Sequence, residues 1–133
     1  MLSSPENQVD VGTIDFATFV SINSQQFRYI VNMFTNSEKV DVTMRPLQVM
    51  FQSPESIMIL NKEDKQCIIA GIEEGEELGF SITLSPTTFF NDLTLIVDRV
   101  WLHLTTTGVS VICAPIDLNV RMEIYFKPSL EVV

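Results

Sequence analysis

The sequence predicts an α+β domain in which an antiparallel sheet carries two helices on one face. Two observations favour this fold class. Short segments of alternating apolar and polar residues surround two segments with helical periodicity. In addition, the order strand–helix–strand–strand–strand occurs twice, over residues 14–62 and 79–128. Each of these units has one apolar helix face that needs sheet surface to cover it.

The chain has the size and composition of one globular domain. It contains 133 residues, of which 46% are hydrophobic and 19% are charged. Residues 1–12 show no periodicity, so we expect a flexible leader before a single domain over residues 13–133. The N-terminus lacks a signal-peptide pattern, and no apolar run is long enough to span a bilayer. We therefore expect an intracellular protein with no membrane partner.

The first unit is predicted to open with a strand over residues 15–22 and to continue into a helix. The apolar-alternating face of this strand consists of Phe16, Thr18, Val20 and Ile22. Asn23 or Ser24 is expected to cap the helix, because either side chain accepts a hydrogen bond from a free N–H of the first turn. The apolar stripe of the helix consists of Phe27, Ile30, Val31 and Phe34.

Three strands are predicted after this helix. The first, within residues 39–45, places Val40, Val42 and Met44 on one face. The other two are "LQVMFQS" and "SIMILNK", and "SPES" (residues 53–56) forms the turn between them.

The second unit repeats the pattern from Gly79 onward. A strand with Phe80, Ile82 and Leu84 on one face leads to Ser85, which is expected to cap a helix with Pro86 at its first position. The predicted apolar stripe is Phe89, Leu93 and Ile96, with Phe90 and Val97 at its margin. This stripe aligns with that of the first helix at an offset of about sixty residues. Three strands follow, the first with Val100, Leu102 and Leu104 on one face, and "APID" (residues 114–117) is expected to turn between the last two.

Two segments lie between these units. "EEGEE" (residues 73–77) is interpreted as a solvated loop that joins them, because its carboxylates do not follow the pattern of a calcium loop. "QCIIAGI" (residues 66–72) leaves two alternatives: it extends the last strand of the first unit, or it is exposed as part of a partner groove.

No residue pattern predicts catalysis, a cofactor or a metal site. Cys67 and Cys113 have neither metal nor redox spacing, and the single histidine, His103, has no nearby partner in a catalytic or ligand pattern. We therefore expect a protein that is not an enzyme. The net charge of −9, with only eight Lys and Arg residues, argues against ordinary nucleic-acid binding.

The layout of the two units resembles a domain of the DNA sliding clamps, the family of proliferating cell nuclear antigen. The resemblance covers about residues 14–130. "EIYFKPSLE" is similar to the end of a clamp chain, and "SPTTFFNDL" resembles the second helix of a clamp domain. In that family six domains close a ring around duplex DNA, with the helices lining the hole. Edge strands pair between subunits, and partners insert a short hydrophobic peptide into a pocket.

The resemblance implies a processivity factor for DNA replication or repair, located in the nucleus or at a viral replication site. Such a factor would assemble with itself or a related clamp subunit, and would tether DNA polymerase or repair proteins at duplex DNA. The DNA-facing residues would be Gln25, Arg28, Asn32, Lys39 and Asn91. The partner-binding residues would be Ile68, Ile69, Lys127, Pro128 and Leu130.

This chain departs from the family pattern in two respects. It has one clamp-like domain instead of two or three, and its predicted helices carry few cations. The first helix has Arg28, with Lys39 just beyond its end, whereas the second has none and is accompanied by Asp92 and Asp98. A second hypothesis therefore stays open: an acidic α+β interaction or assembly module, of a viral or chromatin-associated kind, that does not bind DNA.

Overall fold

A computed structural model describes residues 12–126 of the chain. The first half contains β1 (Phe19–Asn23), α1 (Ser24–Met33), β2 (Val40–Met44), β3 (Gln48–Gln52), β4 (Ile57–Asn61) and β5 (Ile68–Ala70). The second half contains β6 (Leu78–Ile82), α2 (Thr87–Ile96), β7 (Arg99–Leu104), β8 (Ser110–Asp117) and β9 (Val120–Phe126). The fold is α+β, as the sequence predicted.

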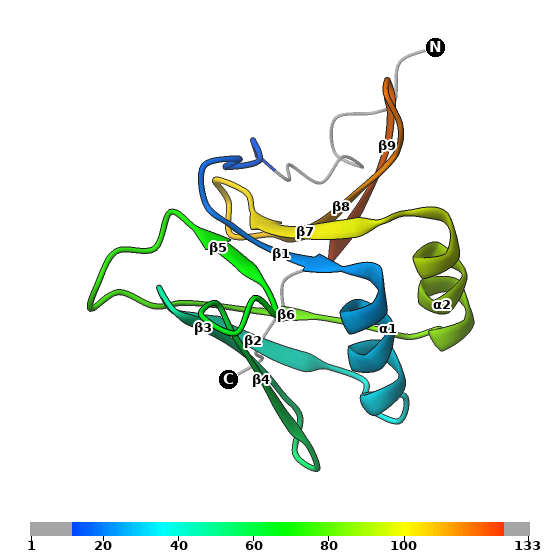
Figure 1. Cartoon of the computed structure of the whole chain (residues 1–133), viewed down its shortest axis with the longest axis horizontal. Helices are drawn as coiled ribbons and strands as arrows, with labels where there is room; N and C mark the ends of the chain where they lie inside the picture. Colours follow the sequence, from blue (N-terminus) through cyan, green and yellow to red (C-terminus); the bar gives the residue numbers. More distant parts are fainter. Residues whose placement is uncertain (1–11, 127–133) are drawn as a thin grey trace, which may run out of the picture.

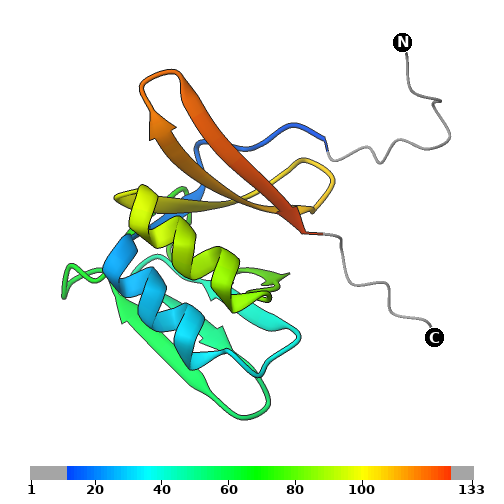
Figure 2. The ribbon, with the colours of Figure 1, turned by 90° about the vertical axis from the view of Figure 1, so that its right-hand side faces the viewer.

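The strands form two antiparallel sheets (Figure 1), whereas the sequence predicted one. A five-stranded sheet has the order β5-β1-β7-β8-β9, and a four-stranded sheet has the order β4-β3-β2-β6. Both helices lie side by side on the same side of the two sheets (Figure 2). A ten-residue helix is about 15 Å long and strands are about 4.8 Å apart, so one helix covers roughly three strands.

The first strand of each half pairs with a strand from the other half. β1 pairs with β7, which follows α2, and β6 pairs with β2, which follows α1. In these ladders Ile22 lies opposite Val100, and Val40 lies opposite Ile82. In the sequence, Ile82 lies 60 positions after Ile22, and Val100 also lies 60 positions after Val40. Each half therefore contributes its first strand to the sheet formed mainly by the other half, and the two exchanged strands pair there in the same register.

Helix α1 forms as predicted. The Oδ1 of Asn23 accepts a hydrogen bond of 2.8 Å from the backbone N–H of Gln26, which makes Asn23 the N-cap. The predicted stripe of Phe27, Ile30, Val31 and Phe34 is fully buried.

Helix α2 is rotated relative to the prediction. Its buried residues are Phe90 and Leu93, with Val97 directly after the helix, whereas Phe89 and Ile96 are 40% and 59% exposed. Pro86 is the N-cap and no side chain caps the helix, so the expected cap at Ser85 is wrong. Apolar residues surround most of this helix, so its periodicity fits two rotations that differ by one residue. Packing against α1 selects one of these two rotations. In it, the ring of Phe90 lies 6.3 Å from the ring of Phe27 on α1.

Three local features also differ from the prediction. β1 begins at Phe19, because residues 16–18 turn, and Phe16 is exposed and lies away from the face of Val20 and Ile22. "APID" belongs to β8, and the turn before β9 lies at Leu118 and Asn119. Residues 66–72 contain a separate edge strand, β5, that pairs with β1. The turn at 53–56 and the loop at 73–77 lie where they were predicted.

One continuous hydrophobic core joins both sheets and both helices. It includes Ile22 and Leu102 from the five-stranded sheet, Phe51 from the four-stranded sheet, and Phe27 and Phe90 from the helices. Neither helix in residues 12–126 has the length and apolar character needed to cross a bilayer.

Candidate interaction surfaces

The outer face of the two helices holds four of the five residues predicted to face DNA. Gln25, Arg28 and Asn32 are exposed on α1, and Asn91 is half-buried on α2. The structure brings two of them together, because Asn91 Nδ2 donates a hydrogen bond of 3.0 Å to Asn32 Oδ1. The fifth, Lys39, is exposed just before β2 and lies 3.8 Å from the carboxylate of Asp41. This exposed ion pair contributes little stability, but it offsets the positive charge of Lys39.

The same helix face is more apolar than the sequence indicated. Five of its exposed side chains are large and apolar or aromatic: Tyr29, Met33, Phe89, Leu95 and Ile96. Within the described residues of α1 and α2, Arg28 is the one cationic side chain, and α2 contributes the carboxylate of Asp92. Sequence reasoning missed this surface because it assigned Phe89 and Ile96 to the core. The face therefore offers apolar contact area and only a weak positive field.

Within residues 12–126, four strands lie at sheet edges: β4 and β6 in the four-stranded sheet, and β5 and β9 in the five-stranded sheet. β4 exposes Ile57 and Ile59, and β9 exposes Val120 and Tyr125. Unpaired N–H and C=O groups beside apolar side chains are a template for pairing with another strand.

The residues predicted to bind partners are only partly on the surface. Ile68 on β5 is 49% exposed, whereas Ile69 is 4% exposed, because it faces Val20 across the ladder and belongs to the core. Lys127, Pro128 and Leu130 lie outside the described residues.

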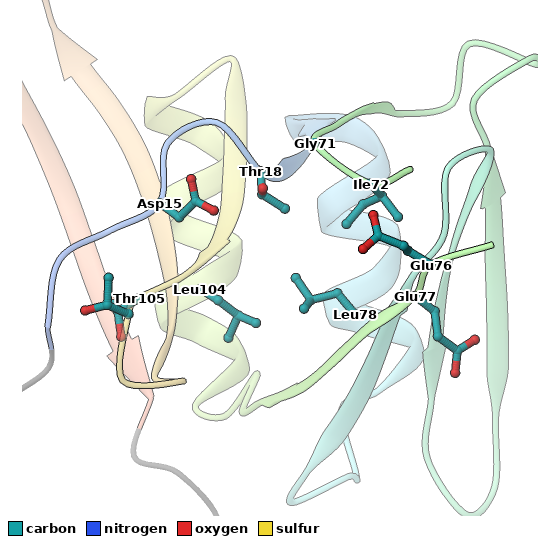
Figure 3. Close-up of a pocket in the computed structure, with 10 residues that line it drawn as sticks. Asp15, Thr18, Gly71, Ile72, Glu76, Glu77, Leu78, Leu104 and Thr105 are labelled. Carbon is teal, nitrogen blue, oxygen red and sulfur yellow. The ribbon is translucent and has the colours of Figure 1, made fainter. Parts of the chain in front are cut away.

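A cavity of about 500 Å³ lies between the two sheets (Figure 3). Leu78 and Leu104 lie opposite each other across it, and Thr18 and Thr105 also line it. Three acidic residues, Asp15, Glu76 and Glu77, also line it. The sequence did not predict this cavity, because its residues meet only through the pairing of distant strands.

The carboxylates of this cavity already have partners within the chain. Glu77 is paired with Arg45 at 3.2 Å, and Glu76 accepts a hydrogen bond from the backbone N–H of Glu73. Asp15 accepts one from the N–H of Ala17. Within residues 12–126, no group of three His, Cys, Asp or Glu side chains is placed to hold a metal ion.

A second cavity, of about 240 Å³, lies on the face of the five-stranded sheet opposite the helices. We call it the aromatic cavity, and its lining residues are Phe16, Phe19, Trp101, His103, Cys113, Pro115 and Arg121. Trp101 and His103 point away from the core because they alternate with the fully buried Val100 and Leu102.

His103 has a structural role in this wall. Its Nδ1 lies 3.2 Å from the carbonyl oxygen of Asp15 and 3.1 Å from that of Thr18. Two carbonyl acceptors require Nδ1 to carry the proton, so the ring donates to both. The rings of Phe16 and Phe19 lie 5.3 and 5.8 Å from the imidazole. His103 thereby holds the turn before β1 against the sheet.

Both cysteines are buried free thiols. Burial raises the pKa of Cys67 above its usual value, and nearby Lys62 and Arg99 partly offset this. Burial is also the main cause of the raised pKa of Cys113, with a smaller contribution from the charge of Glu123. Thiols that stay protonated are weak nucleophiles, so these positions are suited to packing and not to catalysis.

No protein-family model and no curated protein sequence matches this chain.

Proposed function

We propose that this chain is a non-enzymatic, sliding-clamp-like subunit that assembles edge to edge into a ring or half-ring and tethers partners at DNA. One observation carries the proposal: the halves exchange their first strands in the same register, and β4 and β9 lie at outer sheet edges. This arrangement supports the finer prediction from the family resemblance, namely that the domain consists of two strand–helix–three-strand repeats.

The edges explain how copies would join. An exposed strand with apolar side chains pairs readily with another strand, and a closed ring would pair every β4 and β9 edge while β5 and β6 remain at the other sheet edges. Pairing of β9 of one copy with β4 of the next would extend the sheets around an outer wall. The helices lie on one side of both sheets, so they would line the inside of that wall.

A second candidate function is supported by the helix face. A surface that faces DNA needs Lys and Arg to replace the counterions of the phosphates, whereas α1 and α2 carry Arg28 and several exposed apolar residues. This composition favours a protein–protein assembly module that does not bind DNA. The net charge of −9 acts in the same direction.

Light scattering on two matched variants tests the edge-to-edge assembly. Ile59 on β4 and Ile68 on β5 are similarly exposed, at 44% and 49%, and both lie on edge strands. We expect the wild-type chain to form a discrete oligomer that Ile59→Lys dissociates and Ile68→Lys leaves intact. A wild-type monomer at high concentration, or an equal response of the two variants, would contradict assembly through β4.

Binding to a fluorescent 30-base-pair duplex at several salt concentrations separates the two candidates. A clamp-like subunit should bind with an affinity that falls as salt rises, and Arg28→Ala should reduce that dependence. An oligomer without salt-dependent DNA binding would support the assembly module instead.

A further inference from the structure

The cavity between the two sheets has an apolar interior and an acidic rim. Ile72, Leu78 and Leu104 line it and are half-buried, and the first two pack against the core. Asp15 and Glu76 also line it and are exposed, so they lie at its mouth. The volume of about 500 Å³ is within the range of roughly 300–1,000 Å³ that is usual for small-ligand sites. The cavity therefore suits a ligand with an apolar body and a polar head.

The walls of this cavity are held by backbone contacts within one copy of the chain. On one side, the N–H of Asp15 donates a hydrogen bond of 3.1 Å to the carbonyl oxygen of Leu104. Gly71 closes the adjacent wall with a φ of +83°, and a Cβ at this position would lie 2.5 Å from the carbonyl oxygen of Ala17. On the other side, Leu78 is the first residue of β6, which pairs with β2. The cavity is therefore complete without a second copy.

The charge at the mouth selects a cation. Figure 3 shows the side chains of Asp15 and Glu76 directed toward the cavity from opposite sides, whereas that of Glu77 points away, where it pairs with Arg45. Asp15 and Glu76 each accept a hydrogen bond of 3.0 Å from one backbone N–H. A single neutral donor leaves the charge of a carboxylate, and most of its acceptor capacity, unused. Among the described residues, no Lys, Arg or His lines the cavity, so a cationic ligand would meet no repulsion there.

The apolar interior decides which cation fits. The apolar side chains that line it are aliphatic, and no aromatic ring of the described residues lines it. Guanidinium groups and aromatic cations bind well where they stack on a ring, which this cavity does not offer. An unbranched alkyl chain, in contrast, buries its methylene groups against leucine and isoleucine and keeps an ammonium group at the mouth.

We infer that this cavity binds a linear alkylammonium group, with the alkyl chain against Leu78 and Leu104 and the ammonium beside Asp15 and Glu76. A free aliphatic amine and the lysine side chain of a partner protein both carry this group. The inference goes beyond the proposed ring and does not rest on it, because residues of one copy build the whole site.

Isothermal titration calorimetry of the full chain with n-hexylammonium chloride tests the inference, and n-butylammonium chloride and 1-hexanol are the comparison probes. Each buried methylene group should strengthen binding by roughly fourfold, so hexylammonium should bind roughly tenfold more tightly than butylammonium. 1-Hexanol has the same alkyl chain without the charge, so it should bind more weakly than hexylammonium.

Two substitutions in the same loop form the matched pair. Glu76→Gln and Glu74→Gln each remove one negative charge from an exposed position, but only Glu76 lines the cavity. Gln keeps a side-chain oxygen that can accept the hydrogen bond from the N–H of Glu73. Glu76→Gln should weaken hexylammonium binding roughly two- to fivefold, and the Asp15→Asn/Glu76→Gln variant roughly tenfold, whereas Glu74→Gln should change it far less. Thermal melts followed by circular dichroism check that each variant is folded.

A lysine tripeptide distinguishes the two sources of the ammonium group. The side chain of lysine and butylammonium have the same four carbon atoms, so acetyl-Ala-Lys-Ala-amide adds only peptide backbone and two methyl groups. Tighter binding of the tripeptide than of butylammonium would identify a lysine of a partner protein as the ligand. Weaker binding would identify a free aliphatic amine.

Four results would overturn the inference. One is the absence of hexylammonium binding at millimolar concentrations. Another is an equal affinity for hexylammonium and butylammonium, which would show that the net negative charge of the chain attracts any cation. The third is equal binding of 1-hexanol, which would exclude a role of the carboxylates. The fourth is an equal effect of Glu74→Gln and Glu76→Gln, which would place the cation on the loop surface outside the cavity.

Discussion

Asn91 on α2 donates a hydrogen bond of 3.0 Å from its Nδ2 to the Oδ1 of Asn32 on α1. The two residues are 59 positions apart in the sequence, so the bond joins the two halves of the chain. It lies on the exposed side of the helix pair, above the contact between Phe27 and Phe90. The helix pair is therefore held by an apolar contact in the core and by a polar contact at the surface.

Removal of the Asn32–Asn91 bond should reduce stability by a small and measurable amount. We expect Asn32→Ala to lower the free energy of unfolding by about 0.5–1 kcal/mol, the low end for a hydrogen bond that water partly replaces. The measurement is urea denaturation of Asn32→Ala, Asn91→Ala and the double variant, with Gln25→Ala as the control for an exposed polar residue of α1. Strictly additive effects of the two substitutions would show that the bond contributes nothing.

Phe89 and Phe90 test the rotation of α2 directly. Phe90 is 3% exposed and Phe89 is 40% exposed, although they are adjacent and have the same side chain. Phe90→Ala should cost about 3–5 kcal/mol of unfolding free energy, because it leaves a cavity against Phe27, whereas Phe89→Ala should cost far less. Urea denaturation followed by far-ultraviolet circular dichroism compares the two. A larger loss for Phe89→Ala would restore the rotation that the periodicity predicted.

The cap of α1 depends on one side-chain oxygen. Asn23→Ala should lower the free energy of unfolding by about 1 kcal/mol, because the N–H of Gln26 loses its acceptor. Asn23→Asp keeps that acceptor and should be close to wild type. If both variants lose equal stability in thermal melts, the role of Asn23 lies in the β1–β7 ladder and not in capping.

Stability should decline as the pH rises above about 9. The pKa values of Cys67 and Cys113 are raised from 9.0 by burial, so the folded chain keeps two protons that the unfolded chain releases. Their contribution is fully present below pH 9 and is lost as the pH rises through the folded-state pKa values.

Tyr125 adds to this dependence above about pH 10. Its hydroxyl donates a hydrogen bond of 2.8 Å to Glu123, and this bond is the main cause of its raised pKa. Urea denaturation between pH 7 and 10.5 measures the slope, with the Cys67→Ala/Cys113→Ala variant as the comparison. The inference about the thiols fails if this variant loses stability with pH as steeply as the wild type.

Local patterns in the sequence determined the order of elements, with the exception of β5, and the helix α1. The stripe of Phe27, Ile30, Val31 and Phe34 has one clear phase, and Asn23 is a preferred capping residue directly before it. Alternation in β2 also assigned Val40, Val42 and Met44 correctly to the core. These features depend on residues close in the chain, so they are readable without the fold.

Tertiary contacts decided the features that concern function. Phe89 and Phe90 are equally apolar, and only the packing of α2 against α1 turns Phe89 outward, which gives the helix face its apolar character. The exchange of β1 and β6 between the two sheets, and hence the free edges of β4 and β9, follows from pairings between distant strands. The aromatic cavity likewise needs Phe16, Trp101 and Arg121 to meet across three segments. Periodicity records which side of an element is apolar, but burial of that side depends on which other elements pack against it.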